Sequence, residues 1–397
     1  MANVSSSNGL EKRPKLRFPG FDEPWEDTLF SDLYEAANEK NDGSFGVESI
    51  ISVANMYFKE DARITDEGYL KTYNIFKVGD IAFEGNKSND FSHGRFVENT
   101  IGDGIVSHVF VVFKPLHDTH NLRYWKYAIN NESVMGRILA RCTKKTTMMT
   151  NLVTKDFLNQ SIPCPSAQEQ DKIASLLDTI SKRIELQKLY VESLKKYKRG
   201  AIQKLFSETD MEQWNLVKLK DVVKVFDGTH QTPNYKTTGV RFISVENILD
   251  PLATQKYISE DDYRKEFKVH PEYGDVLMTR IGDIGRTYYV NFDSDMAYYV
   301  SLALFKCSPK IEGRFLAAYI STNTFQKELW ERTLHIAFPK KINTGEIGEC
   351  SIRLPSRERQ IAIASYLDVI EKKIRLAEKK LDLIQIIKTG LMQQLFI

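Results

Sequence analysis

Cysteine is scarce in this chain, and its spacing excludes two classes of protein. The four cysteines, Cys142, Cys164, Cys307 and Cys350, lie far apart and form no C-x-x-C pair. Such spacing argues against a zinc site and against the disulfide framework of a secreted protein. We expect reduced thiols and no metal.

Long hydrophobic runs are also missing. The most apolar stretch, residues 105–113, is far too short to span a bilayer, and residues 1–17 are polar and basic with no apolar segment of the kind found in signal peptides. These absences predict a soluble, cytoplasmic protein that does not bind membranes.

Recognisable catalytic motifs are lacking as well. The chain has no Pro-Pro dipeptide, which an adenine methyltransferase motif such as N-P-P-Y requires, and no G-x-x-x-x-G-K-[ST] phosphate loop or G-x-S-x-G elbow. His117 and His120 are three residues apart, but no third ligand follows at a useful spacing, so a polar turn is favoured over a metal site. We expect no catalytic residues, no metal and no cofactor in this chain.

What the chain does contain is an internal duplication. Its 397 residues, of which 42% are hydrophobic and 27% charged, suffice for two or three folded domains. Residues 161–207 and 351–397 align without a gap and share 19 of 47 positions. A fainter repeat lies upstream, where Trp25 matches Trp214 and Gly79-Asp80 matches Gly274-Asp275. The chain is therefore predicted to be two copies of one unit of about 190 residues.

The matched segments have the heptad pattern of coiled-coil helices. In the first copy the predicted pairing residues are Ile173, Leu177, Ile180, Ile184 and Leu194; in the second they are Ile363, Leu367, Ile370, Ile374, Leu381 and Ile384. Ser166 is a candidate N-cap with Glu169 in the capping-box position, whereas the second copy has Arg359 there. Each helix is expected to be about 60 Å long at ~1.5 Å per residue.

Two such helices pair most naturally about a pseudo-twofold axis, which makes them antiparallel and separates the globular parts. The alternative is a long helix that buries its apolar stripe against its own domain. The predicted domains are an N-terminal extension (1–24), a first globular domain (25–160), a central spacer helix (161–207), a second globular domain (208–350) and a C-terminal spacer helix (351–397).

The globular parts mix strand and helix patterns and predict an α+β fold. Residues 109–113 and 303–305 have strand character, while 122–140 and 314–332 have helix character. The order of the strands cannot be read from the pattern.

Several of these segments resemble one known family. The opening PKLRFPGF at 14–21, the repeated tails with their P-S start and I-A-S-x-L-D motif, and the two-unit layout are similar to the specificity subunit of type I restriction-modification enzymes. DGTHQTP at 227–233 and GDVLMTRIGDIG at 274–285 are similar to segments of that family's target-recognition domains. The first unit has GDIAFEGNKS at 79–88 instead, so the two recognition domains are expected to be of different subtypes.

The resemblance implies a function and a set of partners. Each globular unit would read one half of a split, asymmetric double-stranded DNA sequence, and the helices would fix the distance between the halves. Two adenine methyltransferase subunits and motor-nuclease restriction subunits would dock on the chain. These partners would bring S-adenosylmethionine, ATP and Mg²⁺.

The distribution of charge constrains this interpretation. Each tail, 161–207 and 351–397, carries nine basic and five acidic residues, whereas the rest of the chain has a net charge of −6. The chain alone is therefore expected to bind DNA weakly, with partners completing a basic cleft. An alternative is that the lysines of the helices only keep an exposed helix face hydrated. The sequence does not distinguish this alternative from a basic cleft.

The candidate DNA contacts are basic and amide-bearing residues in loop-like stretches, because such side chains match phosphates and major-groove base edges. They are Lys87, Arg141, Lys144, Lys145 and Asn151 in the first unit, and Thr229, His230, Gln231, Arg280, Lys340, Lys341 and Asn343 in the second. Two other functions stay open: a modification enzyme with its own active site, and a coiled-coil scaffold that binds only proteins.

Overall fold

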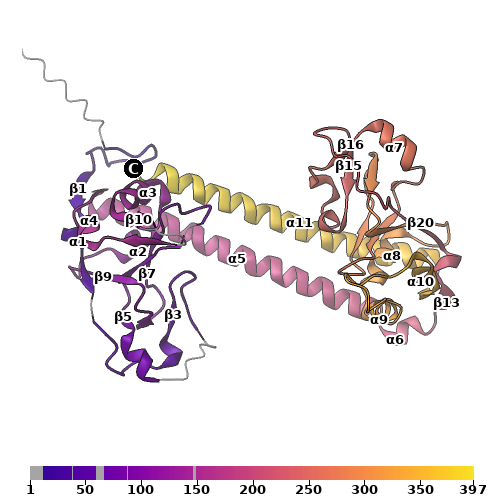
Figure 1. Cartoon of the computed structure of the whole chain (residues 1–397), viewed down its shortest axis with the longest axis horizontal. Helices are drawn as coiled ribbons and strands as arrows, with labels where there is room; N and C mark the ends of the chain where they lie inside the picture. Colours follow the sequence, from indigo (N-terminus) through magenta and orange to yellow (C-terminus); the bar gives the residue numbers. More distant parts are fainter. Residues whose placement is uncertain (1–11, 38, 60–66, 87, 146–148) are drawn as a thin grey trace, which may run out of the picture. The chain divides into compact units, whose positions relative to one another are not determined.

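The computed structural model describes residues 12–37, 39–59, 67–86, 88–145 and 149–397. The chain forms two compact units: unit 1 comprises Met1–Lys188 and Lys380–Ile397, and unit 2 comprises Leu189–Lys379. The two long helices, α5 (Ala167–Leu205) and α11 (Arg357–Gln394), each contribute residues to both units, as their pink and yellow ribbons show (Figure 1).

Unit 1 is built around a four-stranded antiparallel sheet in the order β2-β9-β6-β7. The strands are β2 (Tyr34–Ala37), β6 (Ile81–Glu84), β7 (Arg95–Glu98) and β9 (Val111–Pro115). Phe96, Phe113 and Phe157 form an aromatic cluster with ring centroids 4.5 to 5.8 Å apart. This cluster joins the sheet to the helices in one buried core.

Unit 2 repeats the same sheet. Its order is β14-β20-β17-β18, with β14 (Val223–Asp227), β17 (Val276–Thr279), β18 (Thr287–Tyr289) and β20 (Leu302–Cys307). Every pair in this sheet is antiparallel, as in unit 1. The duplication read from the sequence is therefore a duplication of the fold, and the α+β class is confirmed.

Shorter elements complete the two units. In unit 1 they are β1 (Glu26–Leu29), α1 (Phe30–Leu33), β3 (Ile51–Ser52), β4 (Tyr57–Phe58), β5 (Asn74–Phe76), β8 (Gly104–Val106), α2 (Leu122–Ala128), α3 (Glu132–Cys142), β10 (Thr143–Lys145), β11 (Thr150–Leu152), α4 (Thr154–Leu158) and β12 (Ser161–Cys164). In unit 2 they are α6 (Glu208–Met211), β13 (Asn215–Lys218), β15 (Val240–Ile243), β16 (Tyr257–Ile258), α7 (Glu260–Glu266), β19 (Met296–Tyr298), α8 (Gly313–Ile320), α9 (Asn323–Glu331), α10 (Thr344–Glu349) and β21 (Ser351–Leu354).

Both of the predicted globular helices are in fact helix pairs. The segment 122–140 contains α2, which ends at Ala128, and α3, which Asn131 caps by accepting a hydrogen bond from the amide of Ser133. In 314–332, Thr322 caps α9 in the same way, accepting from the amide of Phe325. Short polar side chains that bond the backbone favour such helix starts.

The repeated Gly-Asp dipeptides form a structural turn. Gly79 and Gly274 have positive φ angles of 91° and 97°, a conformation that glycine adopts without strain. The carboxylate that follows each glycine, of Asp80 or Asp275, accepts a hydrogen bond of 2.8 Å from the amide three residues earlier. This turn leads into β6 in unit 1 and β17 in unit 2, which explains why both copies keep it.

The long helices run antiparallel within unit 2. Lys195 pairs with Glu378 at 2.7 Å, and Lys198 pairs with Glu371 at 3.1 Å, so residue numbers rise along α5 as they fall along α11. The predicted antiparallel arrangement is confirmed there.

The helix starts differ from the prediction in one respect. Ser166 and Ser356 both act as caps, accepting hydrogen bonds from the amides three residues on. Glu169 does not complete a capping box: its buried carboxylate accepts from the indole of Trp25 at 3.1 Å and from the guanidinium of Arg17. The capping-box prediction was wrong because a tertiary partner takes the carboxylate, and this contact ties the chain before β1 to α5.

Candidate nucleic-acid interface

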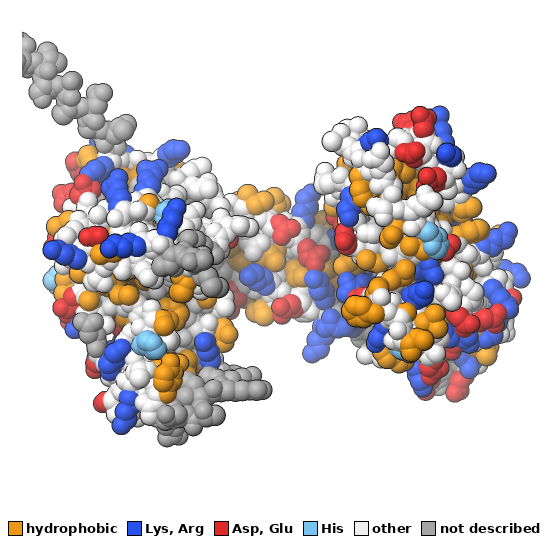
Figure 2. Space-filling model, viewed as in Figure 1, with side chains coloured by type: hydrophobic (Ala, Val, Ile, Leu, Met, Phe, Trp, Pro, Cys, Tyr) orange, Lys and Arg blue, Asp and Glu red, His pale blue; other side chains and the backbone are white. Residues whose placement is uncertain are grey.

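In unit 1 the predicted DNA contacts lie on one hairpin and the helix before it. Arg141 stands in the last turn of α3, and the hairpin β10–β11 that follows places Lys144 directly opposite Asn151. Lys145 is the next residue of β10, and all four side chains are exposed. Lys87 lies outside the described residues. Figure 2 shows Lys and Arg side chains gathered over the part of unit 1 where Figure 1 labels α3 and β10.

A close backbone approach holds this hairpin against the sheet. The amide of Thr150 donates to the carbonyl of Gly85, directly after β6, at 2.8 Å, and the Thr150 hydroxyl donates to the carbonyl of His93 at 3.0 Å. A Cβ atom on Gly85 would lie 2.2 Å from the carbonyl oxygen of Thr150. Only glycine fits here without displacing the hairpin.

In unit 2 the predicted contacts come from three separate segments. Thr229, His230 and Gln231 follow β14, Arg280 follows β17, and Lys340, Lys341 and Asn343 precede α10. Apart from Arg280 and the half-buried Thr229, these side chains are exposed. Sequence separation hid the fact that one residue joins all three segments.

That residue is Arg280. Its Nε donates to the carbonyl of Ile342 at 3.0 Å and its Nη1 to the carbonyl of Val300 at 2.9 Å, while Nη1 lies 3.5 Å from the carboxylate of Asp227. The same carboxylate lies 3.0 Å from Nε2 of His230. Arg280 is only 6% exposed, and burial lowers its pKa despite the opposing effect of Asp227. Its guanidinium therefore holds the loops together and is not presented to solvent.

The segment before α10 forms the second strand of a short hairpin. Lys341 bridges both Leu334 and Ile281, and the ammonium of Lys340 lies 4.5 Å from the centre of the Trp330 ring, within cation–π range. This hairpin stands where β10–β11 stands in unit 1, because the bridge between Asn86 and Met149 is the counterpart of that between Ile281 and Lys341.

The sequence analysis missed the apolar tip of this hairpin. Ile336 and Phe338 are fully exposed, and His335 packs on Trp330 with ring centroids 4.2 Å apart. Figure 2 shows hydrophobic side chains gathered on unit 2 where Figure 1 labels α9. The available signal was two bulky apolar residues in a stretch that ends in Pro-Lys-Lys.

The predicted helix-pairing residues are all at least half-buried. Their surroundings differ along each helix. Ile173 and Leu177 join the core of unit 1, and Ile363, Leu367, Ile370 and Ile374 join that of unit 2. Ile180, Ile184, Leu194, Leu381 and Ile384 are half-buried. Near its start each helix thus also buries its stripe against the domain that precedes it, as the alternative had suggested.

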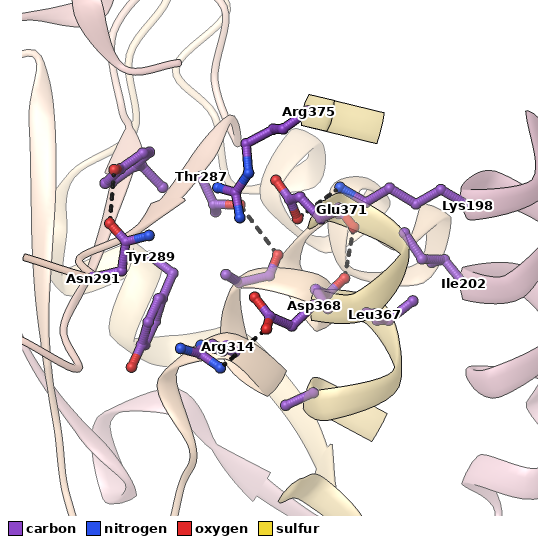
Figure 3. Close-up of a pocket in the computed structure, with 15 residues that line it drawn as sticks. Lys198, Ile202, Thr287, Tyr289, Asn291, Arg314, Leu367, Asp368, Glu371 and Arg375 are labelled. Carbon is purple, nitrogen blue, oxygen red and sulfur yellow. Dashed lines mark hydrogen bonds and ion pairs between the residues drawn. The ribbon is translucent and has the colours of Figure 1, made fainter. Parts of the chain in front are cut away.

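The repeated I-A-S-x-L-D motif anchors the helices to the domains. Asp178 of α5 pairs with Arg123 and Lys126 of α2 at 2.9 and 2.7 Å. In unit 2 the equivalent Asp368 of α11 lies 3.7 Å from Arg314 of α8, beside a pocket of about 180 Å³ (Figure 3). Because Asp368 pairs with Arg314 and Glu371 with Lys198 at this corner, we interpret it as a structural junction.

Among the residues that the structure describes, no group of three or more His, Cys, Asp or Glu side chains could hold a metal ion.

His120 packs on the ring of Trp125, and its Nε2 lies 2.9 Å from the hydroxyl of Tyr34. Burial lowers the pKa of His120 to about 4. The polar turn expected here is present, since the amide of His120 donates to the carbonyl of His117 at 3.0 Å, and the His120 ring packs inward from it. All four cysteines are free. Across the described part of the chain, every helix is too short or too polar to cross a bilayer.

Comparisons with known proteins point to one family. A family model for the type I restriction modification DNA specificity domain matches twice, at residues 31–196 and 211–385. The chain is 27% identical over 276 residues to the type I restriction enzyme MjaVIII specificity subunit of Methanocaldococcus jannaschii. That alignment covers 63% of this chain and 64% of the relative's length.

Solved structures share the fold. The S subunit of a type I restriction-modification system from M. genitalium matches with a TM-score of 0.60 and 16% identity, over 97% of this chain and 99% of the other. A chain from a structure describing assembly and conformational transition of the type I R-M system matches with a TM-score of 0.60 and 15% identity, over 96% and 99% of the two chains.

Proposed function

The chain belongs to the type I restriction modification DNA specificity family, and from this we propose that it reads a two-part, asymmetric sequence in double-stranded DNA, one part with each unit. It acts without catalytic residues of its own. Its place of action is the cytoplasm, where the DNA lies.

The observation that carries this proposal is the matched pair of interfaces. The hairpins after α3 and after α9 occupy the same place in one fold, and each carries adjacent lysines, Lys144-Lys145 and Lys340-Lys341. Lysines fix a protein on phosphates, while neighbouring amide and loop side chains read base edges. Because the two units differ in these neighbouring residues, the two half-sequences differ as well.

The partners follow from the same family. Two adenine methyltransferase subunits and the restriction subunits dock on this chain, and they hold S-adenosylmethionine, ATP and Mg²⁺. The acidic excess outside the two tails makes the isolated chain a weak DNA binder at physiological salt. Binding then strengthens when a methyltransferase completes the cleft.

The two long helices set the gap between the half-sequences. Both helices contribute to both units, so we expect their length to define how far apart the two readers act. Removing seven residues around Val191 of α5 and the matching seven around Leu381 of α11 keeps the heptad phase and shortens each helix by about 10 Å. Genome-wide methylation mapping with the partner methyltransferase then shows a gap shorter by about three base pairs.

The outcome is read on both halves of the site. The bases specified at each end stay unchanged in the shortened protein, and a control that deletes seven residues and reinserts seven of equal heptad pattern restores the original gap. Altered bases at either end, with the gap unchanged, contradict the proposal. Methylation by the purified chain without a partner supports a modification enzyme instead.

A further inference from the structure

The hairpin tip of unit 2 carries the two most exposed large hydrophobic side chains of the described residues. Ile336 and Phe338 are 99% and 104% exposed, in the segment between the bridge partners Leu334 and Lys341. Leaving two large apolar side chains in water forgoes the free energy that their burial would contribute, and exposed apolar groups that lie close together often mark interaction sites.

The tip is held by its backbone. The amide of Leu334 donates to the carbonyl of Lys341 at 2.8 Å, and the amide of Gly282 donates to the carbonyl of Lys340, also at 2.8 Å. Between the two exposed residues, Ala337 is partly buried and its amide donates to the carbonyl of Leu334 at 3.4 Å. Ile336 and Phe338 thus lie two residues apart in one anchored turn, both exposed.

Cationic side chains follow this apolar pair. Lys340 and Lys341 come directly after the tip, and Lys340 lies over Trp330, which also packs against His335. The base of the hairpin is joined through Ile342 to Arg280 and so to the other predicted DNA contacts of unit 2. Apolar side chains flanked by lysines suit a partner that offers both phosphates and flat, stacked rings.

We propose that Ile336 and Phe338 form an apolar wedge that enters between two adjacent base pairs of the half-sequence read by unit 2. This rests on the proposed DNA-reading function and adds a mode of readout to it. Wedges of this kind unstack one base step and kink the duplex, so they favour steps that deform easily, such as pyrimidine–purine steps. The lysines hold the flanking phosphates and place the wedge.

The wedge belongs to unit 2. In unit 1 the described strands of the equivalent hairpin present Lys144, Lys145 and Asn151, which suit polar contacts with phosphates and base edges. The described residues of the unit 1 hairpin thus offer polar contacts, whereas the tip of the unit 2 hairpin adds readout of deformability.

The test uses the full chain with its methyltransferase, on duplexes that carry the methylation-mapped site with 2-aminopurine replacing each adenine of either strand in turn. The wild-type complex raises the fluorescence at one step of the unit 2 half, away from the methylated adenine, which methyltransferases flip out by themselves. Replacing both residues (Ile336→Ala with Phe338→Ala) abolishes that rise and weakens binding roughly tenfold to a hundredfold. Phe338→Trp keeps both.

Controls separate the possible outcomes. Leu249→Ala, which truncates another exposed residue of unit 2 (70% exposed), leaves fluorescence and affinity unchanged. If the wild-type complex methylates its site specifically but shows no rise in fluorescence, the wedge is wrong and the proposed function is unaffected. If binding and methylation by the wild-type complex do not depend on the DNA sequence, both proposals are wrong. If the double alanine variant no longer binds the methyltransferase in the absence of DNA, the tip contacts that protein and not DNA. This outcome also contradicts the wedge.

Discussion

Gly85 and Arg280 occupy the same place in the two copies of the fold, yet they are the smallest and one of the largest side chains. Each follows the third strand of its sheet order, and each carbonyl accepts a hydrogen bond from the hairpin, at 2.8 Å from Thr150 and at 3.0 Å from Ile342. In unit 1 the hairpin carbonyl comes so close that no Cβ fits. In unit 2 the equivalent carbonyl is bonded by the guanidinium of Arg280.

The difference shows two ways of fixing one hairpin on one scaffold. A close backbone contact and the hydroxyl of Thr150 position the unit 1 hairpin, whereas a buried cation positions that of unit 2 and draws in the loop after β14 through Asp227. A duplicated fold can therefore keep the place of its recognition hairpin while exchanging the residues around it. That is what a protein needs if its two halves are to read unrelated sequences.

Among the variants that test this difference between the two hairpins, Arg280→Ala should have the largest effect on stability and on the bases read. It removes the donors from two carbonyls and the arginine partner of Asp227, which keeps His230. We expect the free energy of unfolding to fall by about 2–5 kcal/mol, because buried polar groups lose their hydrogen bonds. Methylation mapping should show relaxed bases in the unit 2 half and unchanged bases in the unit 1 half.

Arg286→Ala is the matched control, since this exposed arginine pairs only with Asp283 and should cost no more than about 1 kcal/mol. Equal relaxation in both halves after Arg280→Ala would mean that the residue does not act on the unit 2 hairpin.

Gly85→Ala should give the mirror result in unit 1. The added methyl would lie 2.2 Å from the carbonyl oxygen of Thr150, so the hairpin with Lys144 and Asn151 has to move. We expect a loss of about 1–3 kcal/mol in unfolding free energy and weaker reading of the unit 1 half only. Chemical denaturation and methylation mapping measure the two effects.

Gly200→Ala serves as its control, because nothing lies within 4 Å of a Cβ there and alanine favours the helix by up to about 1 kcal/mol. Normal recognition of both halves by Gly85→Ala, with unchanged stability, would show that the close approach is not required.

Glu98→Gln should have the smallest effect on which bases are read, and its effect on stability is confined to unit 1. Glu98 is buried opposite Ile81, where unit 2 has Tyr289 opposite Val276, and burial raises its pKa from 4.5 to about 9, with Lys126 opposing the rise. Between these two values the folded protein holds a proton that the unfolded chain releases, so stability falls as the pH rises.

A neutral glutamine removes this dependence. The variant should therefore melt at a higher temperature than wild type at pH 8, by on the order of 10 °C at about 2–4 °C per kcal/mol, and with little difference at pH 4. Calorimetry at the two pH values measures this. An equal rise in melting temperature at pH 4 and at pH 8 would rule out ionisation of Glu98 as the cause.

The repeat made much of the fold predictable. Identical positions in one register, such as Ile173-Ala174-Ser175 with Ile363-Ala364-Ser365, exposed the duplication and both long helices without any structural information. The paired helices α2–α3 and α8–α9 were merged in the prediction, because the Asn131 and Thr322 caps interrupt a hydrophobic pattern that otherwise continues. The capping-box prediction failed for a related reason, since Trp25 and Arg17 are remote in sequence from Glu169.

The candidate interface was predictable only in part. Surface lysines and amides could be selected by residue type, and the structure gathers the described ones of each unit into one region, but their reading of DNA stays a prediction. Arg280 was selected for the same reasons, yet it is buried among carbonyls from segments 20 and 62 residues away. The exposure of Phe338 could not be predicted from the sequence, because a large apolar side chain is expected to be buried.

The sequence by itself determined the two-copy plan, the α+β class, the long helices and their antiparallel pairing, because repeats and heptads are local patterns that survive without knowledge of distant contacts. Only the tertiary structure decided the strand order, the matching place of the two hairpins, and which charged side chains face solvent. Those features depend on hydrogen bonds and packing between segments far apart in the chain, and no local pattern encodes such contacts.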